Sequence, residues 1–100
     1  MNLYRKGRIA EKKVVNRLKE RGFKNISRTK GSRGPYDIRA RTPRGSKVYI
    51  QVKSGTARIT SKGINRLRQI ARRKDGAAAY VHYRGRGEAV WKWFGNWKRR

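Results

Sequence analysis

An alternating pattern runs through Lys47-Val48-Tyr49-Ile50-Gln51-Val52-Lys53 and predicts a β-strand. Because successive side chains of a strand point to opposite faces, one face carries only β-branched residues, namely Val48, Ile50 and Val52. The other face carries Tyr49, Gln51 and Lys53. This second face places an amide oxygen beside an ammonium group, so the strand offers both a core face and a polar face.

The residues before this strand predict one helix and two further strands. The helix runs from about Lys6 to Glu20 and ends at a glycine cap, Gly22. Two extended segments follow, an edge strand over Phe23–Arg28 and a second strand over Tyr36–Arg41, with a loop between them. A turn at residues 42–46 then joins the second segment to the alternating strand, which predicts a hairpin.

The residues after the alternating strand predict a second helix and two more strands. Thr60-Ser61 provides an N-cap, and one face of the helix is apolar, with Ile64, Leu67, Ile70 and Ala71. After Asp75-Gly76, the segment Ala77–Tyr83 is so rich in small and apolar residues that we place it inside the sheet. A turn at 84–87 leads to a last strand at 88–94. The order α-β-β-β-α-β-β predicts an α/β fold with a mixed sheet of about five strands flanked by helices.

The composition indicates a polyanionic partner. Lys and Arg number 30 against five Asp and Glu, which gives a formal net charge of +25. Each phosphate that the protein neutralises releases counterions, so nucleic acid is the expected ligand. Mutual repulsion of these charges also predicts that a bound polyanion stabilises the protein. A membrane surface is less favoured, since no helix pairs a broad apolar face with a basic one.

Length and composition also predict how the chain is organised. A single domain over residues 1–100 fits the length, with residues 95–100 as a basic tail and roughly 60–65% of the unfolded surface buried. The chain has no cysteine, which excludes disulfides and thiolate metal sites. No apolar run approaches the roughly 20 residues of a membrane span, and no signal-peptide core follows the N-terminus. We therefore expect a cytoplasmic protein.

Glu11 is an acidic residue on the expected apolar face of the first helix. Val14, Val15 and Leu18 follow it at i+3, i+4 and i+7, so the four side chains share one face. Burying a bare carboxylate is costly, which predicts that Glu11 meets a cation, a metal ion or a substrate. A plain ion pair with one of the many arginines is the alternative interpretation.

Asp37 provides a second carboxylate, in the strand before the alternating one. If the two strands pair so that Asp37 lies near Gln51, a carboxylate, an amide oxygen and the Lys53 ammonium converge. Glu11 can reach the same point if the first helix packs on that face. Hard oxygen ligands suit Mg²⁺ or Mn²⁺, and a neighbouring lysine can stabilise charge at phosphorus. The set predicts a phosphodiester-hydrolysing site; the alternative is that Asp37 is a turn residue following Pro35.

Five segments, in a fixed order along nearly the whole chain, carry a family resemblance: Arg5-Lys6-Gly7-Arg8-Ile9-Ala10-Glu11, Gly22-Phe23, Gly31-Ser32-Arg33-Gly34-Pro35-Tyr36-Asp37-Ile38, Tyr49-Ile50-Gln51-Val52-Lys53-Ser54 and Ala89-Val90-Trp91-Lys92-Trp93-Phe94. They resemble the archaeal Holliday junction resolvases, which belong to the restriction-endonuclease-like nucleases with the PD-(D/E)XK motif. The resemblance implies a restriction-endonuclease-like fold, endodeoxyribonuclease activity in DNA recombination or repair, and an archaeal or viral host.

The resemblance also implies roles for five residues. Glu11, Asp37 and Gln51 would lie around one or two Mg²⁺ (or Mn²⁺) ions, Lys53 would be the catalytic lysine, and Ser32 would contact phosphate or a DNA strand. Members of the family are homodimers that bind a four-way junction and nick two opposing strands symmetrically. DNA and a second copy of the chain are therefore the expected partners.

Two positions depart from the family pattern. Tyr36 is inserted between Pro35 and Asp37, which is minor because the proline is no ligand. Gln51 stands where such a resolvase has Glu, and a neutral ligand holds a hard cation less tightly. Mrr-like restriction enzymes of the wider class carry Gln at this place and are counted active, so we interpret Gln51 as a tolerated variant. The alternative is a non-catalytic, basic nucleic-acid-binding protein that keeps the fold and has lost the activity.

The remaining basic and aromatic residues have simpler expected roles. Scattered cations should contact phosphate without reading sequence, and we expect this of Arg5, Lys6, Arg8, Arg28, Lys30, Arg33 and Arg58. Trp91 and Trp93 share a strand face, which favours core or dimer packing over base stacking. Trp97 lies outside regular structure and is the better candidate for contact with a partner or with unpaired bases. His82 is assigned no chemistry.

Overall fold

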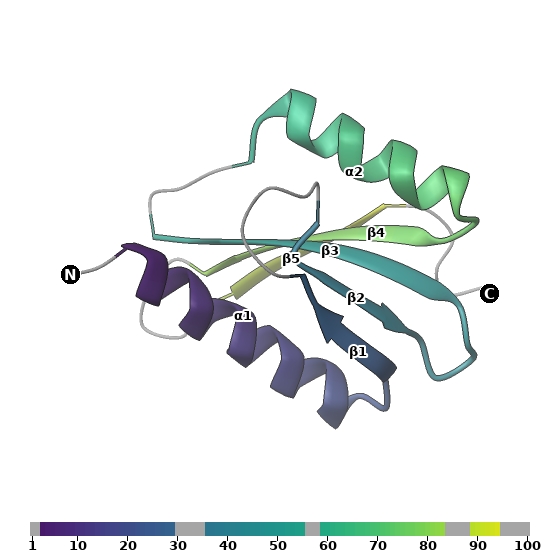
Figure 1. Ribbon diagram of the computed structural model, residues 1–100, viewed down its shortest axis with the longest axis horizontal. Coiled ribbons are helices and arrows are strands. Elements are labelled where there is room, and N and C mark those ends of the chain that lie inside the picture. Colours follow the sequence, from purple (N-terminus) through teal and green to yellow (C-terminus); the bar gives the residue numbers. More distant parts are fainter. Residues whose placement is uncertain (1–2, 30–35, 56–58, 84–88, 95–100) are drawn as a thin grey trace.

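The computed structural model describes residues 3–29, 36–55, 59–83 and 89–94, of which residues 3–8 as backbone only. Two helices lie on opposite faces of one five-stranded sheet (Figure 1). The elements in chain order are α1 (Leu3–Glu20), β1 (Lys24–Arg28), β2 (Ile38–Arg41), β3 (Lys47–Ser54), α2 (Ser61–Arg73), β4 (Ala77–Tyr83) and β5 (Ala89–Phe94). The predicted α/β fold and element order are confirmed.

The sheet is mixed, and β3 is its central strand. Its spatial order is β1-β2-β3-β4-β5. Antiparallel pairing joins β1 to β2, β2 to β3 and β4 to β5, whereas β3 and β4 run parallel. Parallel neighbours need a crossover, and α2 supplies it. The predicted hairpin before residue 47, the edge position of β1 and the interior position of β4 are all confirmed.

The two faces of β3 pack against different helices, as the alternation predicted. Val48, Ile50 and Val52 form one buried cluster with residues of α1, among them Val14 and Leu18. Tyr49, on the other face, forms a second cluster under α2 with Leu67, Ala71 and Ala78. Since α1 covers the face opposite to Tyr49, the condition that the first helix packs on the face of Gln51 and Lys53 is wrong. Sequence alternation fixes which residues share a face but not which helix covers it.

The ends of the elements follow local chemistry. Gly22 after α1 has φ +84°, the left-handed region expected of a helix cap. The Thr60 side chain caps α2 by accepting a hydrogen bond of 3.0 Å from the backbone N–H of Gly63. Helix α1 begins earlier than predicted, at Leu3. Neither helix, in the part of the chain that the structure describes, is long and apolar enough to cross a membrane.

Strand β2 begins at Ile38, two residues later than the predicted start at Tyr36. Asp37 lies directly before the strand, where its backbone bonds to Ile50 and Thr29 and its side chain accepts a further hydrogen bond from β3. The predicted loop around residues 30–35 and the predicted turn at 84–87 lie outside the described residues.

Candidate active site

Asp37 occupies the point at which β2 begins and is 8% exposed. Its backbone N–H donates to the carbonyl of Ile50 at 2.8 Å, and its Oδ2 accepts from the backbone N–H of Val52, also at 2.8 Å. Because ladder N–H groups lie in the sheet, the carboxylate lies near the plane of the sheet rather than on one face. Its side-chain partner is 15 residues away, so the carboxylate bonds to the neighbouring strand as well as lying at the bend before β2.

The electrostatic surroundings of Asp37 leave its negative charge under-compensated. Burial raises the pKa of the Asp37 carboxyl above its usual 3.8, while the hydrogen bond from Val52 and the positive charge of Lys53 lower it by less. A carboxyl whose pKa is raised by burial favours the ionised form again when a further cation arrives. Asp37 is therefore a buried carboxylate whose ionised form a nearby cation would stabilise.

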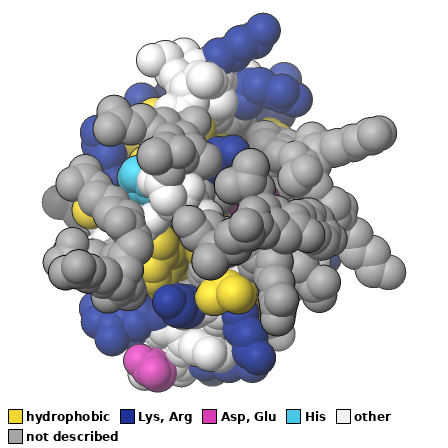
Figure 2. All heavy atoms as spheres, turned by 90° about the vertical axis from the view of Figure 1, so that its left-hand side faces the viewer, with side chains coloured by type: hydrophobic (Ala, Val, Ile, Leu, Met, Phe, Trp, Pro, Cys, Tyr) yellow, Lys and Arg dark blue, Asp and Glu magenta, His cyan; other side chains and the backbone are white. Residues whose placement is uncertain are grey.

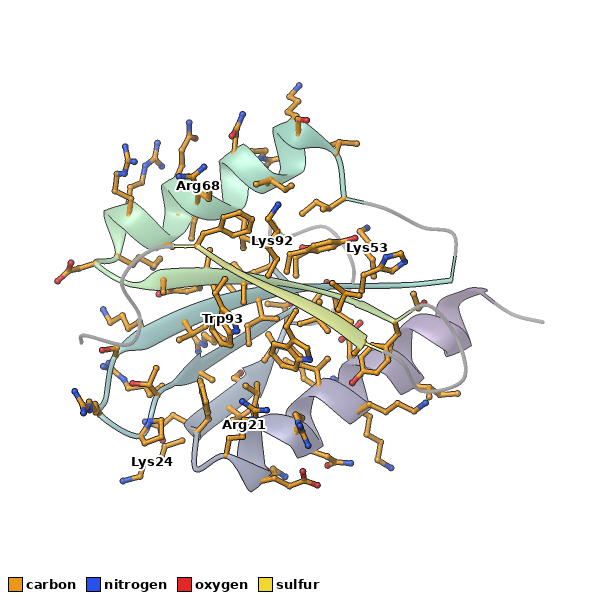
Figure 3. All side chains as sticks on the ribbon, turned by 180° about the vertical axis from the view of Figure 1, so that it is seen from behind. Arg21, Lys24, Lys53, Arg68, Lys92 and Trp93 are labelled. Carbon is orange, nitrogen blue, oxygen red and sulfur yellow. The ribbon has the colours of Figure 1, made fainter. Side chains whose placement is uncertain are left out.

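Gln51 and Lys53 lie on the α2 side of the sheet, next to Asp37. Ile38 pairs with Ile50, so the next position in the register sets Asp37 opposite Gln51. Gln51 is 9% exposed, and Lys53 is half-buried. In Figure 3, Lys53 lies on the same side of the sheet as α2. The structure thus brings Asp37, Gln51 and Lys53 together at the carboxyl end of β3.

Glu11 approaches this end of the sheet from the α1 side. Val14 and Leu18 on its helix face are buried, as predicted, and Glu11 itself is half-buried. Its Oε1 lies 3.5 Å from a guanidinium nitrogen of Arg28, so the arginine pair considered as the alternative is present. Arg28 is the register partner of Ile38, the neighbour of Asp37. A partly exposed ion pair of this kind contributes about 0–1 kcal/mol.

The available donors fit a hard divalent cation. Asp37, Gln51 and Glu11 offer only oxygen, which suits Mg²⁺ or Mn²⁺ completed by water and phosphate. Among the described residues there is no group of three or more His, Cys, Asp or Glu that could hold a metal ion. The Gln51 amide adds a third protein oxygen to the two carboxylates. This end of the molecule is rimmed by basic side chains (Figure 2), which favours a polyanionic substrate.

Several predicted contact residues cannot be placed relative to this site. Ser32, Lys30, Arg33, Arg58 and Trp97 lie outside the described residues. Arg5, Lys6 and Arg8 belong to the first turns of α1, where the structure describes the backbone alone.

His82 is a site neighbour that sequence reasoning missed. It pairs with Lys53 across the parallel strands β3 and β4 and is 8% exposed. Its Nε2 lies 2.8 Å from the Gly55 carbonyl, so this nitrogen carries the proton and donates. The contact fixes the turn directly after Lys53. The only available signal was that parallel pairing of two alternating strands aligns Gln51-Val52-Lys53 with Tyr80-Val81-His82.

Two comparisons with known proteins bear on this arrangement. The family model Mrr_cat, described as a restriction endonuclease, matches residues 6–87. Among solved structures, the chain is similar to Archaeoglobus fulgidus Hjc, a Holliday junction resolvase from an archaeal hyperthermophile. The TM-score is 0.68 at 24% sequence identity, over 89% of this chain and 71% of that chain, which confirms the restriction-endonuclease-like fold. No curated protein matches the chain.

Proposed function

The chain belongs to the restriction endonuclease family, and from this premise we propose that it is a Mg²⁺-dependent DNA endonuclease that selects branched DNA, with four-way junctions as its main substrate. The observation that carries the proposal is the buried carboxylate of Asp37, held by the Val52 N–H between Gln51 and the charge of Lys53. A buried acid with a raised pKa beside a lysine is typical of a functional site rather than of a core.

Each residue has a distinct task in this proposal. The Val52 N–H occupies Oδ2 of Asp37 and orients the carboxylate, so that Oδ1 can face the cation. Gln51 supplies a neutral oxygen from the next strand, and Glu11 supplies a second carboxylate from the α1 side. When bound, Mg²⁺ would polarise the scissile phosphate and lower the pKa of a coordinated water.

Lys53 acts on the substrate rather than on the cation. Its ammonium lies near Asp37, and it stabilises the extra negative charge that develops on phosphorus during hydrolysis. His82 is a positioning residue, because its hydrogen bond to Gly55 holds the end of β3 from which Lys53 projects. Such anchoring keeps the ammonium in place before the substrate binds.

The net charge of the protein supports DNA as the substrate, and symmetry supports a branched DNA. A net charge of +25 favours binding through phosphates, and phosphate contacts position a protein without reading sequence. The likeness to a Holliday junction resolvase supports a branched substrate. A homodimer acting on a two-fold symmetric junction would place one site on each of two opposing strands.

Gln51 also supports a second candidate, a basic nucleic-acid-binding protein that has lost hydrolysis. A neutral amide holds Mg²⁺ less tightly than a carboxylate would. Two observations favour the enzyme. The family model that matches is Mrr_cat, and Mrr-like enzymes are the branch on which we base the interpretation of Gln51 as a tolerated variant. Burial also raises the pKa of the Asp37 carboxyl, as is common for acids at functional sites.

The discriminating experiment compares a labelled four-way junction with a linear duplex of the same arm sequence, in Mg²⁺ and in Mn²⁺. The proposal predicts paired, symmetric nicks in the junction and little cleavage of the duplex. Binding of the junction without cleavage in either metal would favour the non-catalytic candidate. Equal cleavage of both substrates would retain the nuclease and reject junction selectivity.

A further inference from the structure

A groove of about 960 Å³ lies on the α1 side of the sheet, at the β4–β5 edge. Within the part of the chain that the structure describes, helix α1 packs chiefly over β3 and β1, and the groove lies beside it over β4 and β5. Four aromatic side chains contribute to the groove, namely Phe23, Tyr83, Trp91 and Trp93. None of them belongs to the proposed cleavage site, which lies at the carboxyl end of β3 with Gln51 and Lys53 on the α2 side. In Figure 3, Trp93 and Lys53 lie on opposite sides of the sheet.

The aromatic side chains of the groove are arranged as a stacking platform. The ring centroids of Trp91 and Trp93 are 5.8 Å apart with planes 19° from parallel, and Phe23 lies 6.4 Å from Trp93 at 29°. Both tryptophans are half-buried, and both line the groove. Flat apolar rings of this kind bind nucleobases without preference for sequence, because every base has a π-face.

One wall of the groove is a row of three exposed cations, Lys13, Arg17 and Arg21. Lys13 and Arg17 are one helical turn apart on α1, about 6 Å along its axis, and Arg21 follows directly after the end of the helix at Glu20. Lys13 Nζ lies 5.7 Å from the centre of the Tyr83 ring, so the first of these cations contacts one of the aromatic side chains of the groove. The acid that contributes to the groove, Glu20, pairs with Arg17 at 3.5 Å, and its side chain is 66% exposed.

We propose that this groove binds a single-stranded nucleic-acid segment, with bases stacked on Trp91 and Trp93 and phosphates on Lys13, Arg17 and Arg21. A duplex is a poorer occupant, since its bases are already stacked on one another. A second copy of the chain is also poorer, because two-fold contact would set one cation row against the other in molecules of net charge +25 each.

The groove leads toward the end of the sheet that carries the cleavage site. Tyr83 at one end pairs with Ser54, the residue after Lys53, whereas Phe23 and Arg21 lie at the other end. An unpaired strand next to a branch point could therefore occupy the groove while the branch lies at the site. The inference goes beyond the proposed function, because binding in the groove requires neither a metal ion nor hydrolysis.

The test is titration of a labelled oligothymidylate in EDTA, followed by anisotropy and by tryptophan fluorescence. We expect quenching of the fluorescence and about tenfold weaker binding for Trp91→Ala, with most of the affinity kept by Trp91→Phe. The matched control is Val90→Ala, since Val90 is 45% exposed and lies on the opposite face of β5. It should bind as wild type does, and far-UV spectra check that each variant is folded.

Two results would overturn the groove proposal. One is wild-type affinity for the oligonucleotide in Trp91→Ala. The other is loss of a dimer in Trp91→Ala by sedimentation, with unchanged oligonucleotide binding, which would make the groove an interface between copies. Because the titration is carried out in EDTA and measures binding alone, failure of the nuclease proposal does not change how this result is interpreted.

Discussion

The two faces of β3 come from alternate residues of one strand, yet they lie in different surroundings. On the α1 face, Val48 and Ile50 are fully buried and Val52 nearly so. On the other face, α2 covers Tyr49, whereas exposure rises from Gln51 to the half-buried Lys53. Helix α2 packs over Tyr49 and Ala78, so the polar residues of β3 lie in its carboxyl half, beyond this cluster. The polar site therefore needs no hydrophobic core on its own face, because the α1-side core holds the same strand in place.

Truncating the anchored face should give the largest loss of stability. Leu18 of α1 is 1% exposed within the cluster of Val48 and Ile50, so Leu18→Ala should cost about 2–5 kcal/mol of unfolding free energy. Urea unfolding measures this loss, and the neighbouring exposed Lys19→Ala is the control. Cleavage by the fraction that stays folded should be close to wild type. If Leu18→Ala lost cleavage without losing stability, the α1 face would contribute to catalysis as well as to folding, which would contradict this division of roles.

Changing the polar face should reduce cleavage and leave the unfolding free energy nearly unchanged. Lys53→Met should reduce single-turnover cleavage by about 10²–10³-fold while it changes stability by little, because the lost charge acts on the transition state. Lys92→Met is a suitable control, since Lys92 is an exposed cation on the same side of the sheet (Figure 3). If both variants lose activity equally, Lys53 contributes only to general DNA binding.

Gln51→Glu tests whether the amide is the weak ligand of the site. The added carboxylate should raise Mg²⁺ affinity by about tenfold and increase cleavage at limiting metal. Without metal, it sets a second acid opposite Asp37, so stability in EDTA should fall as pH rises. Activity that is unchanged or reduced at every metal concentration would show that this position is not a ligand.

The raised pKa of Asp37 predicts a smaller effect, a change of stability with pH, and fixes the direction of that change. Because the folded-state pKa lies above 3.8, the folded state binds the proton more tightly than the unfolded state does. Stability from this group is complete below pH 3.8 and is lost as pH rises through the folded-state pKa. In EDTA, wild type should therefore lose stability relative to Asp37→Asn over that interval.

Urea unfolding at a series of pH values checks this sign, and addition of Mg²⁺ should reverse the loss in wild type alone. If wild type instead became more stable relative to Asp37→Asn as pH rises, the ionised carboxylate of Asp37 would be stabilised by groups of the protein itself.

Most of the fold was predictable from the sequence, because alternation and helical periodicity are local signals. The order of elements, the interior position of β4 and the split of β3 into Val48 and Tyr49 faces all follow from such patterns. The packing side of α1 was not predictable, since it depends on how the chain crosses the sheet. Asp37 was identified as a candidate, but its place in the sheet plane depends on a hydrogen bond 15 residues away. His82 was missed because its relation to Lys53 exists only through parallel register.

The most direct test of the central claim is nicking of a labelled junction by wild type, Asp37→Asn and Glu20→Gln at saturating Mn²⁺. Both variants remove one negative charge, but Glu20 is an exposed partner of Arg17 and no part of the proposed cleavage site. We predict junction binding by all three proteins, nicking by wild type and Glu20→Gln, and none by Asp37→Asn. Nicking by Asp37→Asn at the wild-type rate would show that the buried carboxylate is not the centre of the chemistry.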